Sequence, residues 1–258
     1  MSVSGAASDR RKPDYGLDAP GMQRTLLYGG FAAVIAGRLF ASWLAQQPHI
    51  DSWQISIRNT LVWGGVSLFI NGAVMFWGSR VGKLRLRDKI LNSIKWRGDE
   101  QVLDVGCGHG LMLIGAAKRL TSGGHGIGVD IWSQVDQADN SAEATLENAK
   151  REGVAGQIEL SNSDARDLPF ADNSFDVILS SFAIHNISAA EGRAKAIQEM
   201  ARVLKPGGRL ALADIHNTSQ YEKVLREIGW QDVKRSFPNF LFVTPTRVIH
   251  AAKPATGP

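Results

Sequence analysis

The feature that most constrains the fold is a glycine cluster that directly follows a short apolar segment. Residues 101–105 have the pattern of a buried strand, and Gly106, Gly108 and Gly110 come next, before a helical pattern over residues 111–120. Glycine lacks a Cβ and tolerates unusual backbone torsions, so a ligand can approach the backbone closely where such a turn opens a helix. The segment predicts an α/β domain with a nucleotide-type binding loop.

The glycine spacing discriminates among nucleotides. A dinucleotide fingerprint needs a glycine where Leu111 stands, and Gly110 comes one position too early for that pattern. A phosphate-binding loop of the Walker type would end in Gly-Lys-Ser or Gly-Lys-Thr, which this segment lacks. An NAD-dependent oxidoreductase therefore remains only a less favoured alternative.

A second apolar run, residues 127–130, ends in an acid twenty residues after Gly110. A carboxylate at that place can accept hydrogen bonds from ribose hydroxyls, so Asp130 is a candidate ligand of a nucleoside. Together, Asp130 and the segment Val-Leu-Asp-Val-Gly-Cys-Gly-His-Gly at 102–110 resemble the first motifs of class I S-adenosylmethionine-dependent methyltransferases. The likeness is to the type 11 and quinone-biosynthesis members of that family.

The resemblance extends over residues 99 to about 253 and implies a cofactor site for S-adenosylmethionine. Residues 163–170 resemble the segment that contacts adenine, in which Asp164 would accept from the exocyclic amine and the Ala165 backbone would meet the ring. Asp104 is expected to organise the methionyl end of the cofactor, and Cys107 to be a small packing residue. The full set of cofactor-binding residues that the resemblance implies is Asp104, Gly106, Cys107, Gly108, Gly110, Asp130, Ile131, Asp164, Ala165 and Ser181.

The expected fold is a Rossmann-like, seven-stranded, mostly parallel sheet with helices on both faces. Further strands are predicted at 158–160, 174–181 and 209–215, and a reversed final hairpin at 230–235 and 242–251. Ser188 and Glu191 have the spacing of a capping box for a helix that ends before the turn at 205–208. Another helix is predicted at 219–228.

Candidate catalytic residues follow the fourth and fifth strands, because ligands of open α/β sheets lie beyond the carboxyl ends of the strands. Methyl transfer needs a base only when the attacking atom must lose a proton. His185 is the first candidate base because imidazole titrates near neutral pH, and Asp214 and His216 share the argument. The alternative is that His185 only packs its loop or bonds to the backbone.

Two apolar runs, residues 26–45 and 60–77, each have about the length that crosses a hydrocarbon core. The turn at 46–56 carries no Lys or Arg, whereas both outer flanks are basic, which predicts a two-pass membrane protein with both termini and the catalytic domain in the cytoplasm. Arg38 lies inside the first run and argues against spanning. The expected organisation is a cytoplasmic tail (1–25), a transmembrane hairpin (26–78), a basic amphipathic helix (79–98) and the methyltransferase domain (99–258).

Small side chains recur along the first run, which predicts a close helix–helix contact. Such a face could also mediate a homo-oligomer, and the alternative to a spanning hairpin is a pair of helices packed on the soluble domain or on a partner chain. The stripe consists of Gly29, Ala33, Gly37, Ala41 and Ala45, with Gly64 and Gly72 as facing positions.

The charge distribution disfavours nucleic acid as a partner. The net charge is +4, but seven basic residues and one acid lie between residues 80 and 97, so the rest of the chain is slightly acidic. Basic side chains directly after an apolar run suit anionic lipid headgroups. The single cysteine, Cys107, excludes an intramolecular disulfide and offers no cluster for a metal site.

The predicted function is methyl transfer to a small lipophilic acceptor, such as a lipid or quinone, at the cytoplasmic membrane face. No Asn-Pro-Pro-Tyr or Asp-Pro-Pro-Tyr follows the fourth strand, which argues against methylation of a nucleobase amine, and no insertion after the fifth strand caps the substrate site. The alternative from another class is a catalytically silent S-adenosylmethionine-binding membrane module that assembles with a partner. A polar segment before the first apolar run could also act as a lid through Tyr15 or Asp18.

Overall fold

The computed structural model describes residues 12–17, 19–133, 140–241 and 244–255. The chain divides into two compact units: Leu17–Lys83, and a second unit formed by Met1–Gly16 together with Leu84–Pro258. Each unit is described by itself. Asp18 lies outside the described residues.

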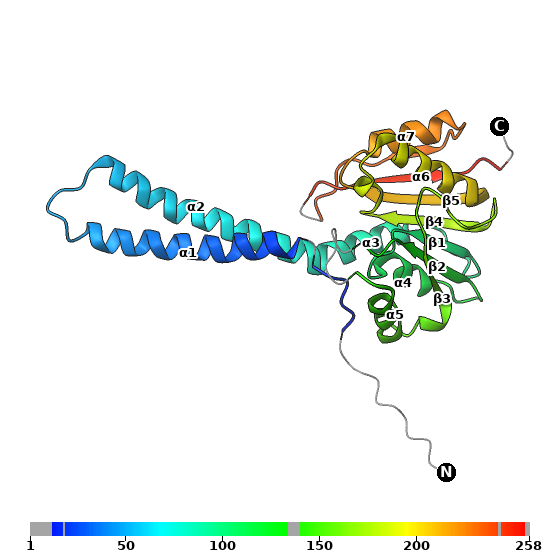
Figure 1. The fold of residues 1–258 in the computed structure, drawn as a ribbon, viewed down its shortest axis with the longest axis horizontal. Coiled ribbons are helices and arrows are strands. Elements are labelled where there is room, and N and C mark those ends of the chain that lie inside the picture. The colour runs from blue at the N-terminus through cyan, green and yellow to red at the C-terminus, as the bar shows by residue number, and fades with distance from the viewer. Residues whose placement is uncertain (1–11, 18, 134–139, 242–243, 256–258) are drawn as a thin grey trace, which may run out of the picture. The chain divides into compact units, whose positions relative to one another are not determined.

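The first unit is a hairpin of two long helices, α1 (Pro20–Leu44) and α2 (Ser52–Trp77), and a π-helical turn (Gly78–Gly82) follows α2 (Figure 1). Pro20 starts α1 at a position where its missing N–H costs nothing. Asp51 and Gln54 form a capping box at the start of α2. Both helices therefore begin earlier than the apolar runs alone predicted, because capping residues set the ends.

The two helices approach most closely at glycines. A Cβ on Gly30 would lie 2.6 Å from the Phe69 amide nitrogen and 2.7 Å from the Gly65 carbonyl oxygen, so only glycine fits there. Gly37 meets Val62, and Gly72 meets Leu27, in the same way. The helix backbones therefore pack directly against each other.

The predicted small-residue face is right at Gly37 and Gly72 but wrong at Gly29 and Gly64, around which nothing lies within 4 Å. The buried positions of α1 recur every seventh residue, not every fourth, and a heptad period is the one that keeps a seam in register between two coiling helices. These buried positions are Gln23, Gly30, Gly37 and Leu44.

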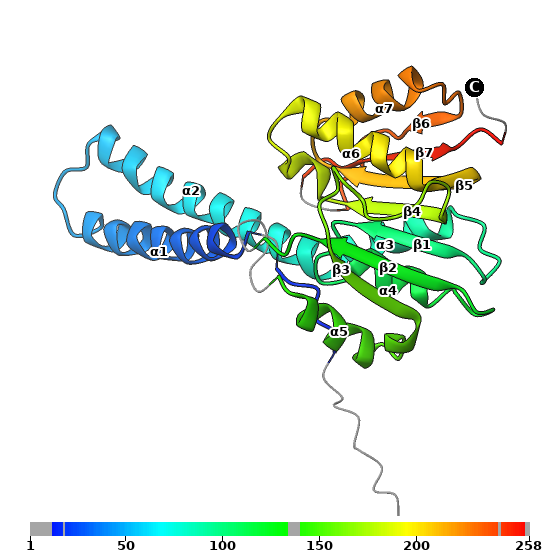
Figure 2. The ribbon, with the colours of Figure 1, turned by 45° about the vertical axis from the view of Figure 1, so that its right-hand side comes forward.

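The second unit is built on a seven-stranded sheet in the order β3-β2-β1-β4-β5-β7-β6 (Figure 2). All pairings are parallel except those of β7, which runs antiparallel to both β5 and β6. The Rossmann-like sheet and its reversed final hairpin are thus confirmed. The strands are β1 (Gln101–Val105), β2 (His125–Asp130), β3 (Ile158–Asn162), β4 (Phe175–Ser181), β5 (Leu204–Asp214), β6 (Val233–Arg235) and β7 (Arg247–Ala252).

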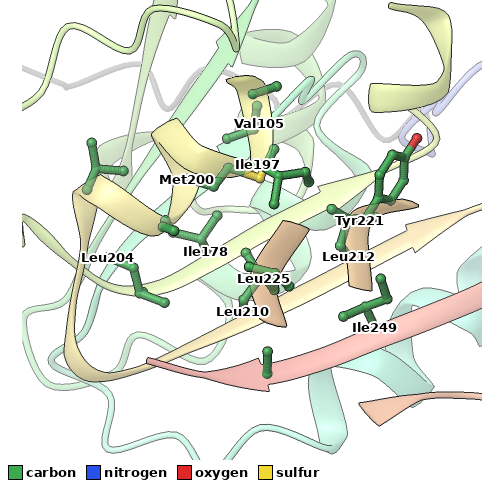
Figure 3. Close-up of a cluster of buried hydrophobic side chains, with 14 of the residues drawn as sticks. Val105, Ile178, Ile197, Met200, Leu204, Leu210, Leu212, Tyr221, Leu225 and Ile249 are labelled. Carbon is green, nitrogen blue, oxygen red and sulfur yellow. The ribbon is translucent and has the colours of Figure 1, made fainter. Parts of the chain in front are cut away.

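Helices cover both faces of the sheet. On one face lie α3 (Lys83–Asn92), α4 (Leu111–Ala117) and α5 (Ala142–Arg151), whose apolar residues pack with Val102, Leu179 and Ile158 of the strands. On the other face lie α6 (Ala190–Val203) and α7 (Thr218–Glu227). Figure 3 shows the core of this second layer, in which Ile197, Met200 and Tyr221 meet Ile178 and Leu212 of the sheet.

Two local expectations need correction. The capping box of Ser188 and Glu191 does not form, because Ala189 is the N-cap of α6 and the Arg193 guanidinium bonds the carbonyls of Ile187 and Ser188 instead. The turn expected at 205–208 is part of β5, since the Gly207 amide donates to the Lys253 carbonyl and continues the pairing. Phe242, where the final strand was expected to start, lies outside the described residues.

Candidate functional site

The glycine loop lies at the carboxyl end of β1, between β2 and the segment after β4. Gly106 has φ of 72°, and a Cβ there would lie 2.1 Å from the Cβ of Ala183, so the position admits no side chain. The amides of Gly106 and Cys107 both donate to the Val129 carbonyl, at 2.8 and 3.1 Å. Gly110, with φ of 81°, is the N-cap of α4. The loop is thereby held against the sheet.

Asp130 closes the loop from the neighbouring strand. Its Oδ2 accepts a hydrogen bond from the Gly108 amide at 2.9 Å, and its Oδ1 accepts from the Trp132 amide at 2.7 Å. The Asn140 side chain donates to Oδ1 at 3.3 Å. The predicted acid therefore lies beside the predicted glycines at the same edge of the sheet.

Helix α5 supplies two supporting residues that the sequence motifs did not indicate. The Thr145 hydroxyl donates to the Gly108 carbonyl at 2.5 Å, and the Asn148 side-chain nitrogen donates to the His109 carbonyl at 3.1 Å. Asn148 also exchanges two hydrogen bonds with the backbone of Asp14, at 2.8 and 2.9 Å. A segment near the start of the chain thus supports the outer side of the glycine loop.

Tyr15, in this N-terminal segment, packs against α4 and α5 with 6% of its surface exposed, and its hydroxyl donates to Glu152 at 3.1 Å. Burial, and next the nearby Glu152 charge, raise the pKa of Tyr15 well above its ordinary value. The expectation that Tyr15 covers the site as a lid is wrong, because its ring is part of a hydrophobic core.

Asp104 is buried within β1, directly below the loop. Its Oδ2 accepts from the Leu113 amide at 2.8 Å, whereas its Oδ1 has no hydrogen-bond partner among the described residues. Burial raises the pKa of Asp104 to about 7, and the negative charge of Asp130 contributes further. A buried acceptor with spare capacity stabilises a cation placed beside it.

The other predicted cofactor residues lie at the carboxyl edge in different states. The Asp164 carboxylate is held by the Arg166 side chain, with Nε at 2.9 Å from Oδ1, and this bond is the main cause of its lowered pKa. Cys107 is buried, and burial raises the pKa of its thiol well above the ordinary value, as suits a packing residue. Ile131 is exposed, and Ser181 and Ala165 are half-buried.

His185 and Asp214, predicted separately, form a pair. His185 lies in a short 3-10 turn after β4 (Ile184–Asn186), and Asp214 is the last residue of β5. The Nδ1 atom of His185 lies 2.6 Å from Oδ1 of Asp214, and the His185 amide donates to Oδ2 at 3.1 Å. The Asp214 side chain is fully buried, while 18% of the His185 side chain is exposed.

Tyr221, which no motif indicated, completes this cluster from α7. Its hydroxyl donates to Oδ2 of Asp214 at 3.1 Å, and burial raises the pKa of Tyr221, with the Asp214 charge as the second cause. The ring of His216 lies 6.3 Å from that of His185, centroid to centroid, and His216 is exposed. The structure therefore brings the three predicted catalytic residues together: Nδ1 of His185 lies next to the acid, although the angles there are not those of a hydrogen bond, and His216 lies farther out.

Comparison with known protein families gives a match for the part of the chain from β1 to β5. Residues 103–212 match the family model described as a methyltransferase domain. This part of the chain is an S-adenosylmethionine-dependent methyltransferase domain. The match begins within β1 and ends within β5, so it contains the glycine loop, Asp130 and His185.

Two curated relatives are similar to part of this chain. A demethylmenaquinone methyltransferase of Lactobacillus johnsonii is 32% identical over 155 residues, covering 60% of this chain and 58% of the relative. A chloroplastic 2-phytyl-1,4-beta-naphthoquinone methyltransferase of Arabidopsis thaliana is 30% identical over 141 residues, covering 54% and 51%. The chain thus spans little more than half the length of these relatives.

The fold recurs in solved structures. The crystal structure of the cyclase SpnF superposes with a TM-score of 0.55 at 19% identity, over 67% of this chain and 81% of that chain. At this level of identity the likeness concerns the fold alone, because one fold carries many reactions.

The residues of the methyltransferase domain fit S-adenosylmethionine. Asp104 offers a buried, unused acceptor oxygen that suits the ammonium group of an amino acid. Gly106 lets the loop pass directly against Ala183, and Asp130 presents a carboxylate at the end of the next strand. When bound, the cofactor supplies an electrophilic methyl group on a sulfonium ion.

Proposed function

We propose that the whole chain transfers a methyl group from S-adenosylmethionine to a hydroxyl of a small lipophilic acceptor at a membrane surface. The observation that carries this proposal is the pair of His185 and Asp214 at the carboxyl edge of the sheet, the edge that also bears the glycine loop and Asp130. Cofactor residues and a proton acceptor thus share one edge.

The pair has the arrangement of a general base. A buried carboxylate that holds Nδ1 of an imidazole favours the tautomer with its proton on Nδ1, and this leaves the lone pair of Nε2 free to accept a proton. Asp214 is itself fixed by three further donors, the amides of His185 and Ile215 and the hydroxyl of Tyr221. His185 would therefore take the proton of an acceptor hydroxyl while Asp214 stabilises the imidazolium that results.

A base accelerates methyl transfer only when the attacking atom must lose a proton, and among such acceptors we propose a hydroxyl. The two relatives named above are by name methyltransferases of demethylmenaquinone and of 2-phytyl-1,4-beta-naphthoquinone. Reduced quinones and phenols have acidic hydroxyls and apolar bodies, so they are the acceptor class that we propose. The roles of Asp164 and Ala165 at adenine, and of Ile131 and Ser181 in the cofactor site, remain parts of the same proposal.

The lipophilic character of the acceptor rests on the hairpin. Helices α1 and α2 are long and apolar enough to cross a membrane, with mean hydropathies of 1.4 and 1.5 over their most apolar windows. Their outward side chains are large and apolar, among them Phe31, Leu39 and Ile70. We propose that the hairpin spans the bilayer, and because both of its ends continue into the same domain, the domain lies on one side, which the positive-inside rule makes the cytoplasmic side.

Arg38, which argued against spanning, is exposed on α1, and Arg58 is the corresponding basic residue of α2. Both lie on the loop side of their helices, about 10 Å from the helix ends at roughly 1.5 Å of rise per residue. Long basic side chains can reach the interface from that depth, so these two residues are compatible with a spanning hairpin.

The hairpin's glycine face is filled by the partner helix within the same chain. We therefore do not propose a homo-oligomer through Gly30, Gly37, Gly65 or Gly72.

The test uses the full chain in lipid vesicles with methyl-tritiated S-adenosylmethionine and either reduced long-chain quinones or water-soluble catechols. We expect the label to pass into the organic phase with the membrane-held acceptor. Asp130→Ala, which removes the acid beside the loop, is the negative control. Transfer only to the soluble catechols would refute the lipophilic acceptor, and cofactor binding without any transfer would favour the silent module.

A further inference from the structure

Two exposed phenylalanines of the methyltransferase unit lie in one loop. They are Phe237 and Phe240, at 93 and 71%; the other large hydrophobic side chains exposed among the described residues of this unit are Ile131 and Leu146, at 62 and 37%. Ile131 directly follows β2, and the two phenylalanines lie between β6 and β7. A soluble surface has no reason to present an aromatic ring that is almost wholly in water, so this group points to a partner.

The loop of the two phenylalanines lies at the carboxyl edge of the sheet. Because β7 is antiparallel to both β5 and β6, strand β6 runs parallel to β5, and the chain leaves β6 at the edge where Asp214 ends β5. Strand β7 then begins at Arg247, which pairs with Asp214. Phe237 and Phe240 therefore share an edge with His185 and with the glycine loop.

The loop is held by hydrogen bonds that leave the two rings outside. Asn239 and Thr246 exchange two backbone hydrogen bonds, at 2.7 and 2.9 Å, and the Ser236 amide donates to the Val248 carbonyl at 2.8 Å. Leu241 packs inward against the core that contains Val248, together with Trp96 and Phe182. One apolar side chain of the loop is thus used for packing, while Phe237 and Phe240 are directed away from it.

The sequence around the loop has the pattern of a membrane-surface segment. Residues 236–246 contain no Asp, Glu, Lys or Arg, whereas Lys234 and Arg235 precede them and Arg247 follows. Aromatic side chains bury in the headgroup region. Lys234 and Arg235 each lie 3.0 Å from an acid, Asp232 and Glu222, so the rings and not these cations carry the argument. At the opposite edge, residues 171–174, which precede β4, carry only small or polar side chains.

The points at which the domain continues into the hairpin lie at the same edge. Asp14, just before one junction, bonds to Asn148 and His109 beside the glycine loop. Helix α3, which follows the other junction, ends with Asn92 bonded to Arg119 at the far end of α4, so α3 begins toward the start of α4 and the carboxyl edge. The chain therefore leaves and re-enters the methyltransferase unit at the edge that also carries the aromatic loop.

We propose that residues 236–241, the aromatic loop, insert Phe237 and Phe240 into the headgroup region of the bilayer. The proposal rests on the membrane hairpin of the proposed function. It adds that the domain itself binds the lipid surface, with the edge that carries His185 turned toward the membrane. An acceptor could then reach the site without crossing water.

The test is labelling of the full chain in vesicles of phosphatidylcholine and phosphatidylglycerol with a lipid-dissolved, carbene-generating probe. Trypsin isolates the relevant segments, because it cleaves after Arg235 and Arg247 around the loop and after Arg58 and Arg80 around the second span. The peptide of residues 203–209, from the opposite edge, is the internal control. We expect label on the loop peptide and on the hairpin peptide, and none above background on the control.

A variant makes the result specific. Phe237→Asp with Phe240→Asp should lose the label on the loop peptide while the hairpin peptide keeps it, because the replaced rings are exposed and do not support the core. Ser122→Asp with Ala171→Asp adds the same charge at the opposite edge and should change nothing. Cofactor binding by calorimetry checks that both variants are folded.

The outcomes separate the two proposals. A labelled hairpin with a loop peptide at the control level would overturn the aromatic loop's role and leave the membrane hairpin standing. An unlabelled hairpin would overturn both. Loss of label from the loop upon raising the protein concentration would show that a second copy of the chain covers the rings, which also contradicts lipid insertion.

Discussion

At the scale of single residues, the buried carboxylate of Asp214 determines what His185 can do. Its oxygens accept from the amides of His185 and Ile215 and from the Tyr221 hydroxyl, and Nδ1 of His185 lies 2.6 Å away. With so many donors the carboxylate has one orientation, and in the function that we propose it favours the imidazole tautomer with the proton on Nδ1. His185 would then be ready to accept a proton before the methyl acceptor binds.

Replacement of the base tests this role. His185→Gln should lower kcat for a hydroxyl acceptor roughly 10²- to 10⁴-fold, the usual contribution of general acid–base catalysis. The affinity for S-adenosylmethionine should stay unchanged, since His185 contacts none of the glycine-loop residues through the bonds described above. Steady-state kinetics together with calorimetry measures both quantities.

Asp214→Asn and His216→Gln are the matched variants for the base. Asp214→Asn should lower kcat similarly, and the double variant with His185→Gln should be little worse than either, because the two side chains act as a unit. His216→Gln should be nearly neutral, since its ring lies 6.3 Å from that of His185. Full activity of His185→Gln would exclude it as the base.

Asp104 predicts a pH dependence of stability. The pKa of Asp104 is raised to about 7, above the value of about 3.9 for an unfolded chain, so the folded protein binds more protons between these values. Its contribution to stability is fully present below about pH 4 and is lost as the pH rises through 7. Asp104→Asn should remove this loss from the thermal unfolding midpoints, whereas Asp167→Asn at an exposed site should not. If the unfolding midpoint of Asp104→Asn fell with rising pH as steeply as that of the wild type, Asp104 would not be the group responsible.

Sequence motifs predicted the residues of the glycine loop, but they could not predict which side chains contact these residues in the folded domain. Position after a strand was enough to nominate His185 and Asp214 one by one, whereas their pairing depends on two loops meeting in space. Thr145 and Asn148 carry no motif, because their role depends on α5 lying against the glycine loop. The hydrogen bond of Asp164 to the adenine of the cofactor remains a prediction. In the structure the Asp164 carboxylate already accepts a hydrogen bond from the Arg166 side chain.

At the scale of elements, the hairpin and the N-terminal segment show what sequence periodicity can miss. Small residues indicated a close helix pair, but a four-residue stripe placed the contact on Gly29, while the seven-residue period of coiling helices places it on Gly30. A difference of one residue rotates the contact by about 100° around a helix. The period of a pattern therefore decides which face packs.

Adjacent glycines provide a matched test of the hairpin. Gly30→Ala should destabilise the helix pair in micelles by about 1–3 kcal/mol, because the new Cβ would meet the backbone of Phe69 and Gly65. Gly29→Ala, with nothing within 4 Å, should be neutral or slightly stabilising through helix propensity. The free energy of unfolding from a detergent titration measures both. Equal effects of the two substitutions would contradict the packing.

The N-terminal segment is tied to the cofactor loop through Asn148. Asn148→Ala removes hydrogen bonds to Asp14 and His109 and should cost about 1–3 kcal/mol of unfolding free energy. It should also weaken S-adenosylmethionine binding, since the loop loses a support. Lys150→Ala, on the exposed side of the same helix, is the control, and unchanged cofactor affinity in Asn148→Ala would show that the support is irrelevant to the site.

At the scale of the whole molecule, sequence patterns predicted the α/β sheet, its reversed last hairpin and two long apolar helices. The periodic spacing of apolar residues in a strand or helix is a property of the local sequence, so it can be recognised without knowing the tertiary contacts. Residues 12–16 belong to the methyltransferase unit, but sequence patterns could not predict this. The segment is polar and turn-rich, so it has no hydrophobic periodicity, and its position depends on Tyr15 packing against α4 and α5. The chain thus leaves the domain and returns to it around the hairpin.

The most direct test of the central claim is the formation of S-adenosylhomocysteine by the full chain in vesicles that contain a lipophilic hydroxyl acceptor. We predict that the wild type forms it only when the acceptor is present, and that His185→Gln binds S-adenosylmethionine without forming it. A wild type that binds the cofactor but forms no S-adenosylhomocysteine with any membrane-held acceptor would contradict the account.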